Sequence, residues 1–228
     1  MTKVKICGLM RLEDISYVNG YQPDYAGFVF APGRHQVDEE WVQGLKLFLD
    51  PEIAVVGVFV NQPLDLVAGM CDRKTIDIVQ LHGEEDEAYI EKLKEKTGRP
   101  VIKAVRVKTT QDILDADQLP CDYLLLDTYI KGIYGGSGQS FDLELIPKLK
   151  KPYFLAGGLT PENVQEKIEI CHPFGVDTSS GVEGEDGWKD LDKVRLFISK
   201  AREEQDRRVT KNSTENLAPL AVSMCRKH

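Results

Sequence analysis

The sequence has no long apolar run and no paired cysteine motif. No apolar stretch reaches the roughly 18 residues that a membrane-spanning helix needs. The start, Met1-Thr2-Lys3-Val4-Lys5, lacks the apolar stretch of a secretory signal. The five cysteines are scattered and form no C-x-x-C pair, so we expect reduced thiols and neither disulfides nor a zinc site. These absences predict a cytoplasmic protein without a membrane partner.

Basic residues are too few for a general nucleic-acid-binding protein. The chain of 228 residues has 29 Lys and Arg against 37 Asp and Glu, which gives a net charge of -8. Because binding to nucleic acid depends on a basic face that neutralises phosphates, we expect no such partner. From Arg207 onward, five basic residues stand against one acid, and the stretch lacks helical periodicity. We therefore expect a domain over residues 1–205 and a flexible basic tail over 206–228.

Short β-branched runs alternate with longer amphipathic segments over the first 205 residues. The runs predict strands, and the segments between them have the apolar spacing of helices. Strands that are separated by helices cannot pair as hairpins, so they run parallel with right-handed crossovers. We expect strands at 4–7, 25–30, 53–60, 76–81, 101–105, 123–127, 153–156 and 174–178, and helices at 39–48, 85–97, 143–150, 161–170 and 191–201.

Two parallel architectures fit this alternation, an open doubly wound sheet and a closed barrel. An open sheet usually carries a G-x-G-x-x-G turn after its first strand, and Cys7-Gly8-Leu9-Met10 stands there instead. Eight βα units in about 200 residues match a closed barrel. The predicted fold is therefore α/β, a single (βα)8 TIM barrel, in which chemistry takes place at the C-terminal ends of the strands.

Glycine and hydroxyl side chains mark the turns after the seventh and eighth expected strands. Gly157 and Gly158 precede a helix whose start is indicated by Thr160 as N-cap. Ser179 and Ser180 follow the last strand. Loops seven and eight of such barrels, often with a helix N-terminus, are a recurrent phosphate-binding site. The alternative is that both stretches are simple tight turns.

Cys7 and Asp127 end the first and sixth expected strands. Alternation puts Lys5 on the same strand face as Cys7, and a nearby ammonium favours the thiolate, which can take a proton from carbon. Asp127 ends an apolar strand, where a carboxyl group can donate a proton. A base and an acid that face each other across a barrel mouth suit isomerisation. The alternative for Cys7 is a small apolar filler of the core.

The four histidines form no H-x-H or H-x-x-x-H pair, so we expect no metal. His82 follows the fourth strand, and we expect it to hydrogen-bond a ligand or a backbone carbonyl. The Gly135-Gly136-Ser137-Gly138 segment lies in a long connection after the sixth strand, where it is either a loop that folds over substrate or a flexible linker.

The order and spacing of eight stretches resemble the phosphoribosylanthranilate isomerase family of tryptophan biosynthesis. The resemblance spans residues 3 to about 203. The stretches are Lys5-Ile6-Cys7-Gly8, Gly27-Phe28-Val29-Phe30, Val56-Gly57-Val58-Phe59-Val60-Asn61, Val79-Gln80-Leu81-His82-Gly83-Glu84, Leu125-Leu126-Asp127, Gly135-Gly136-Ser137-Gly138, Ala156-Gly157-Gly158-Leu159 and Val176-Asp177-Thr178-Ser179-Ser180-Gly181-Val182-Glu183.

The resemblance implies an Amadori rearrangement of N-(5-phospho-β-D-ribosyl)anthranilate to 1-(2-carboxyphenylamino)-1-deoxy-D-ribulose 5-phosphate, catalysed without a cofactor or metal. It implies that Cys7 is the general base and Asp127 the general acid. The only partner implied is the phosphorylated small-molecule substrate, and the chain is expected to be a monomer or a homodimer. The implied phosphate-binding residues are Gly157, Gly158, Ser179 and Ser180, and Asp177 and His82 are implied to lie near the anthranilate.

One position departs from the family pattern. The family usually has an arginine after the second strand that orients the anthranilate, and the most direct register puts His35 there, with Arg34 one residue earlier. A neutral imidazole cannot reproduce the bidentate contact of a guanidinium with a carboxylate. Either Arg34 reaches the carboxylate through a shifted loop, or the affinity for substrate is reduced.

His35 therefore keeps open a function of another class, a phosphate-binding barrel with impaired or lost catalysis that serves as a binding module. A third hypothesis is a related barrel enzyme that acts on another sugar phosphate, such as an epimerase. It fits less well because the sequence lacks paired metal-ligand histidines.

Overall fold

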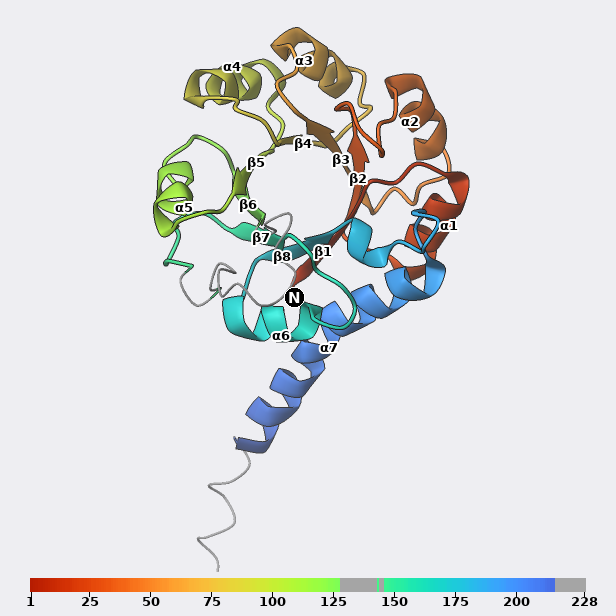
Figure 1. The fold of residues 1–228 in the computed structure, drawn as a ribbon, viewed down its shortest axis with the longest axis vertical. Helices are drawn as coiled ribbons and strands as arrows, with labels where there is room; N and C mark the ends of the chain where they lie inside the picture. The colour runs from red at the N-terminus through yellow and green to blue at the C-terminus, as the bar shows by residue number, and fades with distance from the viewer. Residues whose placement is uncertain (128–142, 144–145, 216–228) are drawn as a thin grey trace, which may run out of the picture.

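Eight parallel strands close into one barrel in sequence order, each paired with the next and β8 paired with β1 (Figure 1). The structure is a computed structural model that describes residues 1–127, 143 and 146–215, with side chains as far as residue 203. The strands are β1 Lys3–Cys7, β2 Tyr25–Val29, β3 Ala54–Phe59, β4 Ile78–Leu81, β5 Val101–Arg106, β6 Tyr123–Asp127, β7 Tyr153–Ala156 and β8 Gly175–Thr178. The predicted (βα)8 barrel is confirmed.

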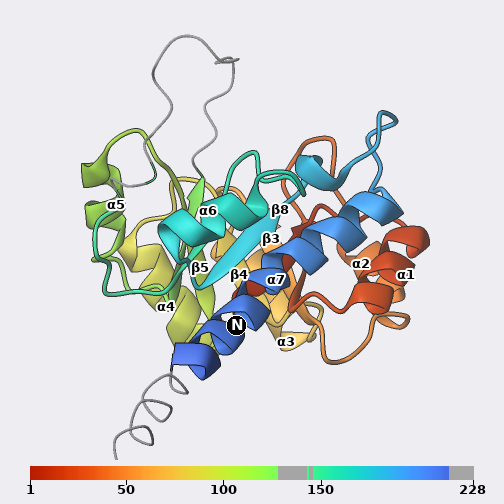
Figure 2. The same ribbon diagram turned by 90° about the horizontal axis from the view of Figure 1, so that it is seen from below.

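Helices surround the barrel and cover its outer face (Figures 1 and 2). Asp38 and Asp86 cap two of them, because their carboxylates accept hydrogen bonds from the amides of Trp41 (2.8 Å) and Tyr89 (2.9 Å). The described helices are α1 Leu12–Tyr21, α2 Glu39–Lys46, α3 Leu64–Asp72, α4 Glu87–Thr97, α5 Thr110–Ala116, α6 Val164–Cys171 and α7 Leu191–Glu215, and a 3₁₀ turn, η2, spans Ser180–Val182.

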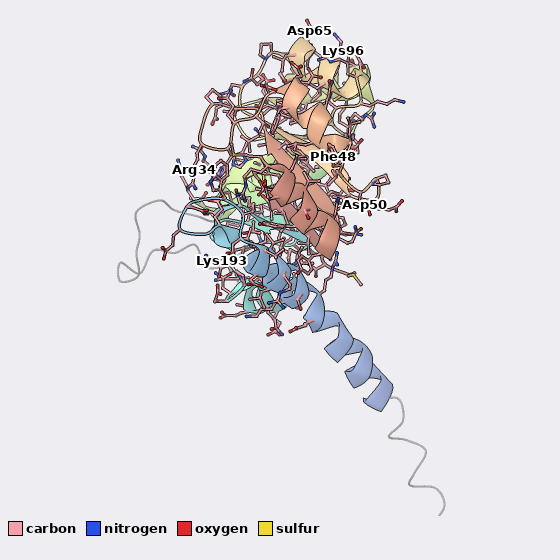
Figure 3. The ribbon with its side chains drawn as sticks, turned by 90° about the vertical axis from the view of Figure 1, so that its right-hand side faces the viewer. Arg34, Phe48, Asp50, Asp65, Lys96 and Lys193 are labelled. Atoms are coloured by element: carbon pink, nitrogen blue, oxygen red, sulfur yellow. The ribbon has the colours of Figure 1, made fainter. Side chains whose placement is uncertain are left out.

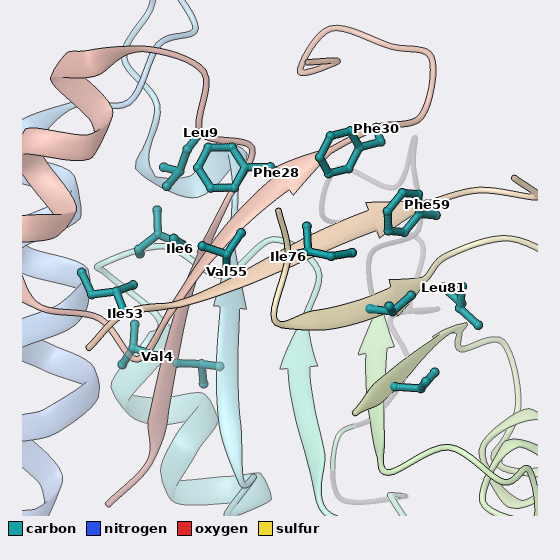
Figure 4. Packing of buried hydrophobic residues seen from close by; sticks show 14 of the residues in the cluster. Val4, Ile6, Leu9, Phe28, Phe30, Ile53, Val55, Phe59, Ile76 and Leu81 are labelled. Atoms are coloured by element: carbon teal, nitrogen blue, oxygen red, sulfur yellow. The ribbon is translucent and has the colours of Figure 1, made fainter. Parts of the chain in front are cut away.

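The larger apolar core lies between the strands and the helices. Figure 4 shows part of it, in which Phe28, Val55 and Phe59 are fully buried. The rings of Phe30 and Phe59 stack with their centroids 5.2 Å apart. None of the helices in the described part of the chain is long and apolar enough to cross a membrane.

A smaller apolar cluster fills the barrel interior near its N-terminal end. The rings of Tyr25, Tyr123, Phe154 and Phe174 contact one another at centroid distances of 5.2 to 5.9 Å. Each comes from the first residues of a strand or from the residue just before one. Because these rings fill the N-terminal end, a ligand-sized space remains at the C-terminal mouth.

Strand boundaries agree with the prediction to within two residues, whereas the helix expected over 143–150 is wrong over residues 146–150; Leu143 is in a 3₁₀ turn. Residues 146–150 are not helical, although the sequence favoured a helix over 143–150. Pro147 accounts for this, since it has no amide hydrogen and its ring disfavours the helical conformation of the preceding residue.

Helix α6 begins at Val164, three residues later than the expected start. The amide of Val164 nevertheless donates to the carbonyl of Thr160 (3.0 Å), and the amide of Glu162 donates to the Thr160 hydroxyl (3.2 Å). The N-cap of α6 is therefore Asn163, and the prediction of Thr160 at that position is wrong; Thr160 starts the turn that leads into the helix.

Helix α7 continues through Glu215, ten residues past the predicted end of the domain at residue 205 (Figure 1). The sequence of 206–215 lacks an apolar face, but helix propagation adds one hydrogen bond per residue and needs no such face. Residues 216–228 lie outside the described residues. The division into a barrel and a basic tail stays a prediction.

Candidate active site

A cavity of about 490 Å³ opens at the C-terminal mouth of the barrel. Its wall includes the ends of β1, β4, β6, β7 and β8 and the turns that follow them. Eight of the ten site residues that the sequence indicated line this cavity, and Arg34 and His35 do not. The eight are Cys7, His82, Asp127, Gly157, Gly158, Asp177, Ser179 and Ser180.

Cys7 lies beside a buried ion pair at the cavity wall. Lys5 Nζ donates to Asp177 Oδ1 (2.8 Å), and Lys5 is fully buried. These residues are register neighbours on β1 and β8, so their side chains meet inside the barrel. Burial disfavours the charged form of Lys5, but Asp177 and Cys7 raise its pKa overall, which keeps an ammonium next to the thiol.

The thiolate that the sequence led us to expect at Cys7 is not the favoured form in this structure. Burial raises the pKa of the Cys7 thiol, and the lowering effect of Lys5 does not overcome it. Asp177 explains part of this result, because its carboxylate neutralises Lys5 and itself raises the pKa of Cys7. The sequence indicated the Lys5 ammonium but not its counter-ion.

Gly27 leaves the space that Cys7 occupies. A Cβ at this position would lie 2.8 Å from Cys7 Sγ and 3.1 Å from Lys5 Nζ. The Gly27 carbonyl also accepts hydrogen bonds from the amides of Gly8 (2.9 Å) and Leu9 (3.1 Å), which fixes the backbone just after Cys7. Gly27 therefore positions the thiol although it carries no side chain.

We expect Gly27→Ala to lower kcat by about 10²-fold, because the new methyl displaces the thiol from its position. Steady-state turnover and the thermal unfolding midpoint should be measured together. Gly44→Ala is the matched control, since a Cβ at Gly44 meets nothing within 4 Å. Equal turnover in the two variants would show that the exact position of Cys7 does not matter.

Asp127 and His82 meet on another part of the cavity wall. His82 Nε2 lies 3.8 Å from Asp127 Oδ2, and both side chains are about one quarter exposed. On its other side, His82 Nδ1 lies 3.1 Å from Gln80 Nε2. Among the described residues, His82 thus contacts a carboxylate and an amide, and its expected hydrogen bond to a ligand or a backbone carbonyl stays a prediction.

The turns after β7 and β8 touch each other. Gly157 and Gly158 have φ angles of 91° and 68°, in the left-handed region that favours glycine. The Thr178 hydroxyl donates to the carbonyl of Leu159 (2.7 Å), and a Cβ on Gly181 would lie 1.8 Å from the same oxygen. Any side chain at Gly181 would therefore separate the two turns.

The backbone amides of these turns are available to an anion. Within the described residues, no group accepts a hydrogen bond from the amides of Gly158, Ser180 or Gly181. All three residues line the cavity. Backbone amides that converge on one space form an anion-binding site.

A buried ion pair that the sequence did not indicate supports the Ser179 turn. Lys189 Nζ donates to the carbonyl (3.0 Å) and hydroxyl (3.2 Å) of Ser179 and to Glu183 Oε1 (2.8 Å). Burial raises the pKa of Glu183, but His35 and Lys189 together lower it to about 2. No local pattern predicts this pair, because an isolated Lys and Glu in a loop usually face solvent.

His35 belongs to this loop network. Its Nε2 lies 2.9 Å from Glu183 Oε1, so the imidazole contacts the turn after β8 and not the cavity. His35 therefore connects the loop after β2 to the turn that carries Ser179.

Arg34 lies at the edge of the molecule, as Figure 3 shows. Its side chain is 59% exposed and 3.6 Å from Glu183. The guanidinium occupies the space above Gly187, where a Cβ would coincide with it. Arg34 must leave Gly187 before it can contact a ligand in the cavity.

Two further expectations concern a metal and the long loop. In the parts of the chain that the structure describes, no group of three or more His, Cys, Asp or Glu side chains is placed to hold a metal ion. The Gly135-Gly136-Ser137-Gly138 segment, expected to be a loop over substrate or a linker, lies outside the described residues.

The closed barrel and the polar side chains at its mouth define the chain as a (βα)8-barrel enzyme. Residues 4–200 match the family model described as N-(5'phosphoribosyl)anthranilate (PRA) isomerase. The chain belongs to this family. One relative, the N-(5'-phosphoribosyl)anthranilate isomerase of Lachnoclostridium phytofermentans, is 47% identical over 209 residues, which are 86% of this chain and 95% of the relative.

Solved structures agree with this assignment. The phosphoribosyl anthranilate isomerase of Thermotoga maritima is similar, with a TM-score of 0.80, 38% identity and coverage of 89% of this chain and 100% of that one. Another isomerase, solved in complex with reduced 1-(o-carboxyphenylamino)-1-deoxyribulose 5-phosphate, has a TM-score of 0.77 and 35% identity, with the same coverage.

Proposed function

We propose that this chain converts N-(5-phospho-β-D-ribosyl)anthranilate to 1-(2-carboxyphenylamino)-1-deoxy-D-ribulose 5-phosphate, a step of tryptophan biosynthesis, with Asp127 as acid and Cys7 as base. The observation that carries the proposal is the shared cavity, which contains a thiol, a carboxyl group and two adjoining turns rich in backbone amides. An aldose-ketose isomerisation needs an acid and a base and has no net oxidation or reduction.

The phosphate of the substrate binds at the turns after β7 and β8. Gly157 and Gly158 allow close approach of the backbone, and Ser179 and Ser180 add amides and hydroxyls. Lys189 stabilises this site because its Nζ donates hydrogen bonds to the carbonyl and the hydroxyl of Ser179. The phosphate fixes one end of the substrate, so the ribose extends between Cys7 and Asp127.

Asp127 carries out the first proton transfer. Its carboxylic acid protonates the ribose ring oxygen, the C1–O bond breaks, and the lone pair of the anthranilate nitrogen forms the C1=N bond of a Schiff base. The acid becomes a carboxylate in this step, and His82 Nε2 lies 3.8 Å from one of its oxygens.

Cys7 carries out the second transfer. Its thiolate removes the C2 proton, the C–H electrons form a C1=C2 bond, and the iminium electrons return to nitrogen. The resulting enolamine tautomerises to the ketone when the hydroxyl proton leaves O2 and C1 gains a proton. A proton transfer of this kind is typically worth about 10²- to 10⁴-fold in rate.

A fluorescence assay that follows the loss of phosphoribosylanthranilate tests the function directly. The proposal expects turnover by the purified chain without added cofactor. If the chain binds inorganic phosphate and the reduced product analogue but converts no substrate, it is a phosphate-binding module without catalysis. This is the alternative that His35, in place of the family's arginine, left open.

Arg34 is the residue we propose for the substrate carboxylate. Its guanidinium is held by one contact at 3.6 Å and is largely exposed, so only a weak interaction has to break before it turns toward the cavity. We expect Arg34→Ala to lower kcat/KM about tenfold, the size of a lost charge-assisted hydrogen bond. The control is Arg195→Ala on α7, which removes an exposed guanidinium bound to Asp192. Unchanged kinetics in Arg34→Ala would show that another group holds the carboxylate.

We further propose that the chain forms a homodimer through an apolar patch that consists of Leu12, Leu47 and Phe48. Leu47 and Phe48 are 85% and 64% exposed, and Phe48 and Leu12 border a hollow of about 380 Å³. Figure 3 labels Phe48. The isomerase of Thermotoga maritima is dimeric. Exposed apolar groups that cluster in this way favour association.

We expect Phe48→Lys to convert the dimer to a monomer, because an ammonium at the patch loses hydration on association. Sedimentation equilibrium measures the mass of each species. Leu196→Lys is the control, since Leu196 is also exposed but lies on α7. A wild-type chain that sediments as a monomer, or a Phe48→Lys variant that still dimerises, contradicts the patch.

We place the protein in the cytoplasm. The support is its cysteines, since the four that are described, Cys7, Cys71, Cys121 and Cys171, are all free thiols. Thiols stay reduced in that compartment. Cell fractionation with an antibody against the chain tests this placement.

A further inference from the structure

Gln80 has a buried amide side chain at the active site. The proposed reaction assigns no role to it. It lies in β4, is 1% exposed, and lines the cavity that contains Cys7 and Asp127. Its Nε2 lies 3.1 Å from His82 Nδ1, whereas its Oε1 has no hydrogen-bond partner among the described residues. An amide that is buried with one atom unpaired costs free energy, so packing alone does not account for glutamine here.

The contact with Gln80 determines which nitrogen of His82 carries the proton. A neutral imidazole has one N–H and one lone pair, and an amide nitrogen is always a donor. With Gln80 Nε2 as donor, His82 Nδ1 accepts and the proton lies on Nε2. That nitrogen is 3.8 Å from Asp127 Oδ2, which is too long for a hydrogen bond, and catalytic hydrogen bonds that are long in the free enzyme often shorten when substrate binds.

The opposite arrangement is less favourable on two counts. If the Gln80 amide were turned over, Oε1 would accept from Nδ1–H, and the amide nitrogen would take the buried position in which Oε1 now has no partner among the described residues. Whenever Asp127 is ionised, the lone pair on His82 Nε2 would then face a carboxylate oxygen, and the two electron-rich atoms would repel each other. In the arrangement with Nε2 as donor, one N–H of Gln80 is directed toward His82 Nδ1, and the Nε2–H of His82 faces the carboxyl group of Asp127.

We propose that Gln80 is a positioning residue that holds His82 as the Nε2–H tautomer, so that the imidazole presents a hydrogen-bond donor to Asp127. This inference rests on the proposed role of Asp127 as the acid. A lone pair at Nε2 would accept the acidic proton of Asp127 and divert it from the substrate. An N–H leaves that proton for the ribose ring oxygen and stabilises the carboxylate that remains after the transfer.

The tautomer can be measured by NMR on protein that carries ¹⁵N-labelled histidine. At about pH 8, two-bond ¹H–¹⁵N correlations distinguish the protonated nitrogen of a neutral ring from the other nitrogen. Comparison with His82→Gln assigns the His82 signals. We expect a pyrrole-type Nε2 and a pyridine-type Nδ1 in the wild-type chain. A pyrrole-type Nδ1 overturns the proposal, and this result needs no variant of Gln80.

Two variants then test whether Gln80 is the cause. Gln80→Met removes the donor, so we expect a mixture of tautomers. Gln80→Glu replaces it with a carboxylate that accepts from Nδ1–H, so we expect the tautomer to change to Nδ1–H. Gln43→Met is the matched control, because Gln43 donates to Thr75 Oγ1 (3.0 Å) at a distance from the cavity. A wild-type tautomer in both Gln80 variants overturns the proposal.

Kinetic measurements distinguish a positioning role of Gln80 from a purely structural role. We expect the single-turnover rate to fall roughly tenfold in Gln80→Met and about 10²-fold in Gln80→Glu, with KM changed less than about twofold. Equal rates in Gln80→Glu and the wild type, despite a changed tautomer, overturn the proposal. Asp127→Asn tests the acid separately: if that variant stays active, the acid assignment fails, whereas the NMR result still reports the tautomer that Gln80 imposes.

Discussion

Cys7→Ala should abolish measurable isomerisation, with kcat lowered by about 10²- to 10⁴-fold or more, because the variant lacks the group that we propose removes the C2 proton. The variant should still fold, since Cys7 is the last residue of β1 and its side chain borders the cavity at the barrel mouth. It should also bind the reduced product analogue, because the phosphate turns do not depend on the thiol. Turnover measured by fluorescence and binding measured by calorimetry separate these two properties.

Two controls show whether the acidity of the thiol is what matters. Cys7→Ser keeps the size of the side chain but not its acidity, so it should be nearly as inactive as Cys7→Ala. Cys121→Ala removes another buried thiol and should keep normal turnover. Retained activity in Cys7→Ser would mean that the group acts as a hydrogen-bond donor and not as a base.

The pH dependence of the wild-type chain follows from the same group. Burial raises the pKa of Cys7, so the thiol is protonated at neutral pH and the thiolate fraction increases as pH rises. We therefore expect the Cys7 thiolate to contribute a factor to kcat/KM that increases with pH through the alkaline range, whereas Asp127 contributes only in its protonated form.

Asp127→Asn should lower kcat by about 10²- to 10⁴-fold, because an amide has the shape of the carboxyl group but cannot donate a proton to the ring oxygen. The loss should fall on kcat more than on KM, since phosphate binding is unchanged. Steady-state kinetics with both parameters resolved, together with calorimetric binding of the product analogue, measure this division.

The matched control is Asp65→Asn at the outer surface, where Asp65 Oδ1 pairs with Lys96 Nζ at 2.6 Å (Figure 3). Exposed pairs of this kind contribute little to stability, so activity and folding should be normal. An Asp127→Asn variant with full turnover would refute the assignment of the acid and leave the assignment of Cys7 intact.

The barrel and the location of most of the site could be predicted from the amino-acid sequence alone. Eight β-branched runs and the helical spacing between them are local signals, each readable within a short window. Once the strands are parallel, their C-terminal ends must meet at one mouth, so Cys7 and Asp127 could be assigned to the same site without coordinates. The glycine turns at Gly157 and Gly158 were predictable for the same reason.

The groups that surround these residues could not be predicted from the sequence, because they depend on contacts between segments that are distant along the chain. Lys5 and Asp177 are 172 positions apart, and they pair because closure of the barrel sets the register of β1 against β8. The same closure buries Cys7 and raises the pKa of its thiol. Arg34 and His35 lie outside the cavity because the loop after β2 binds Glu183. Such contacts depend on distances between distant segments, and no periodicity within a window of sequence encodes them.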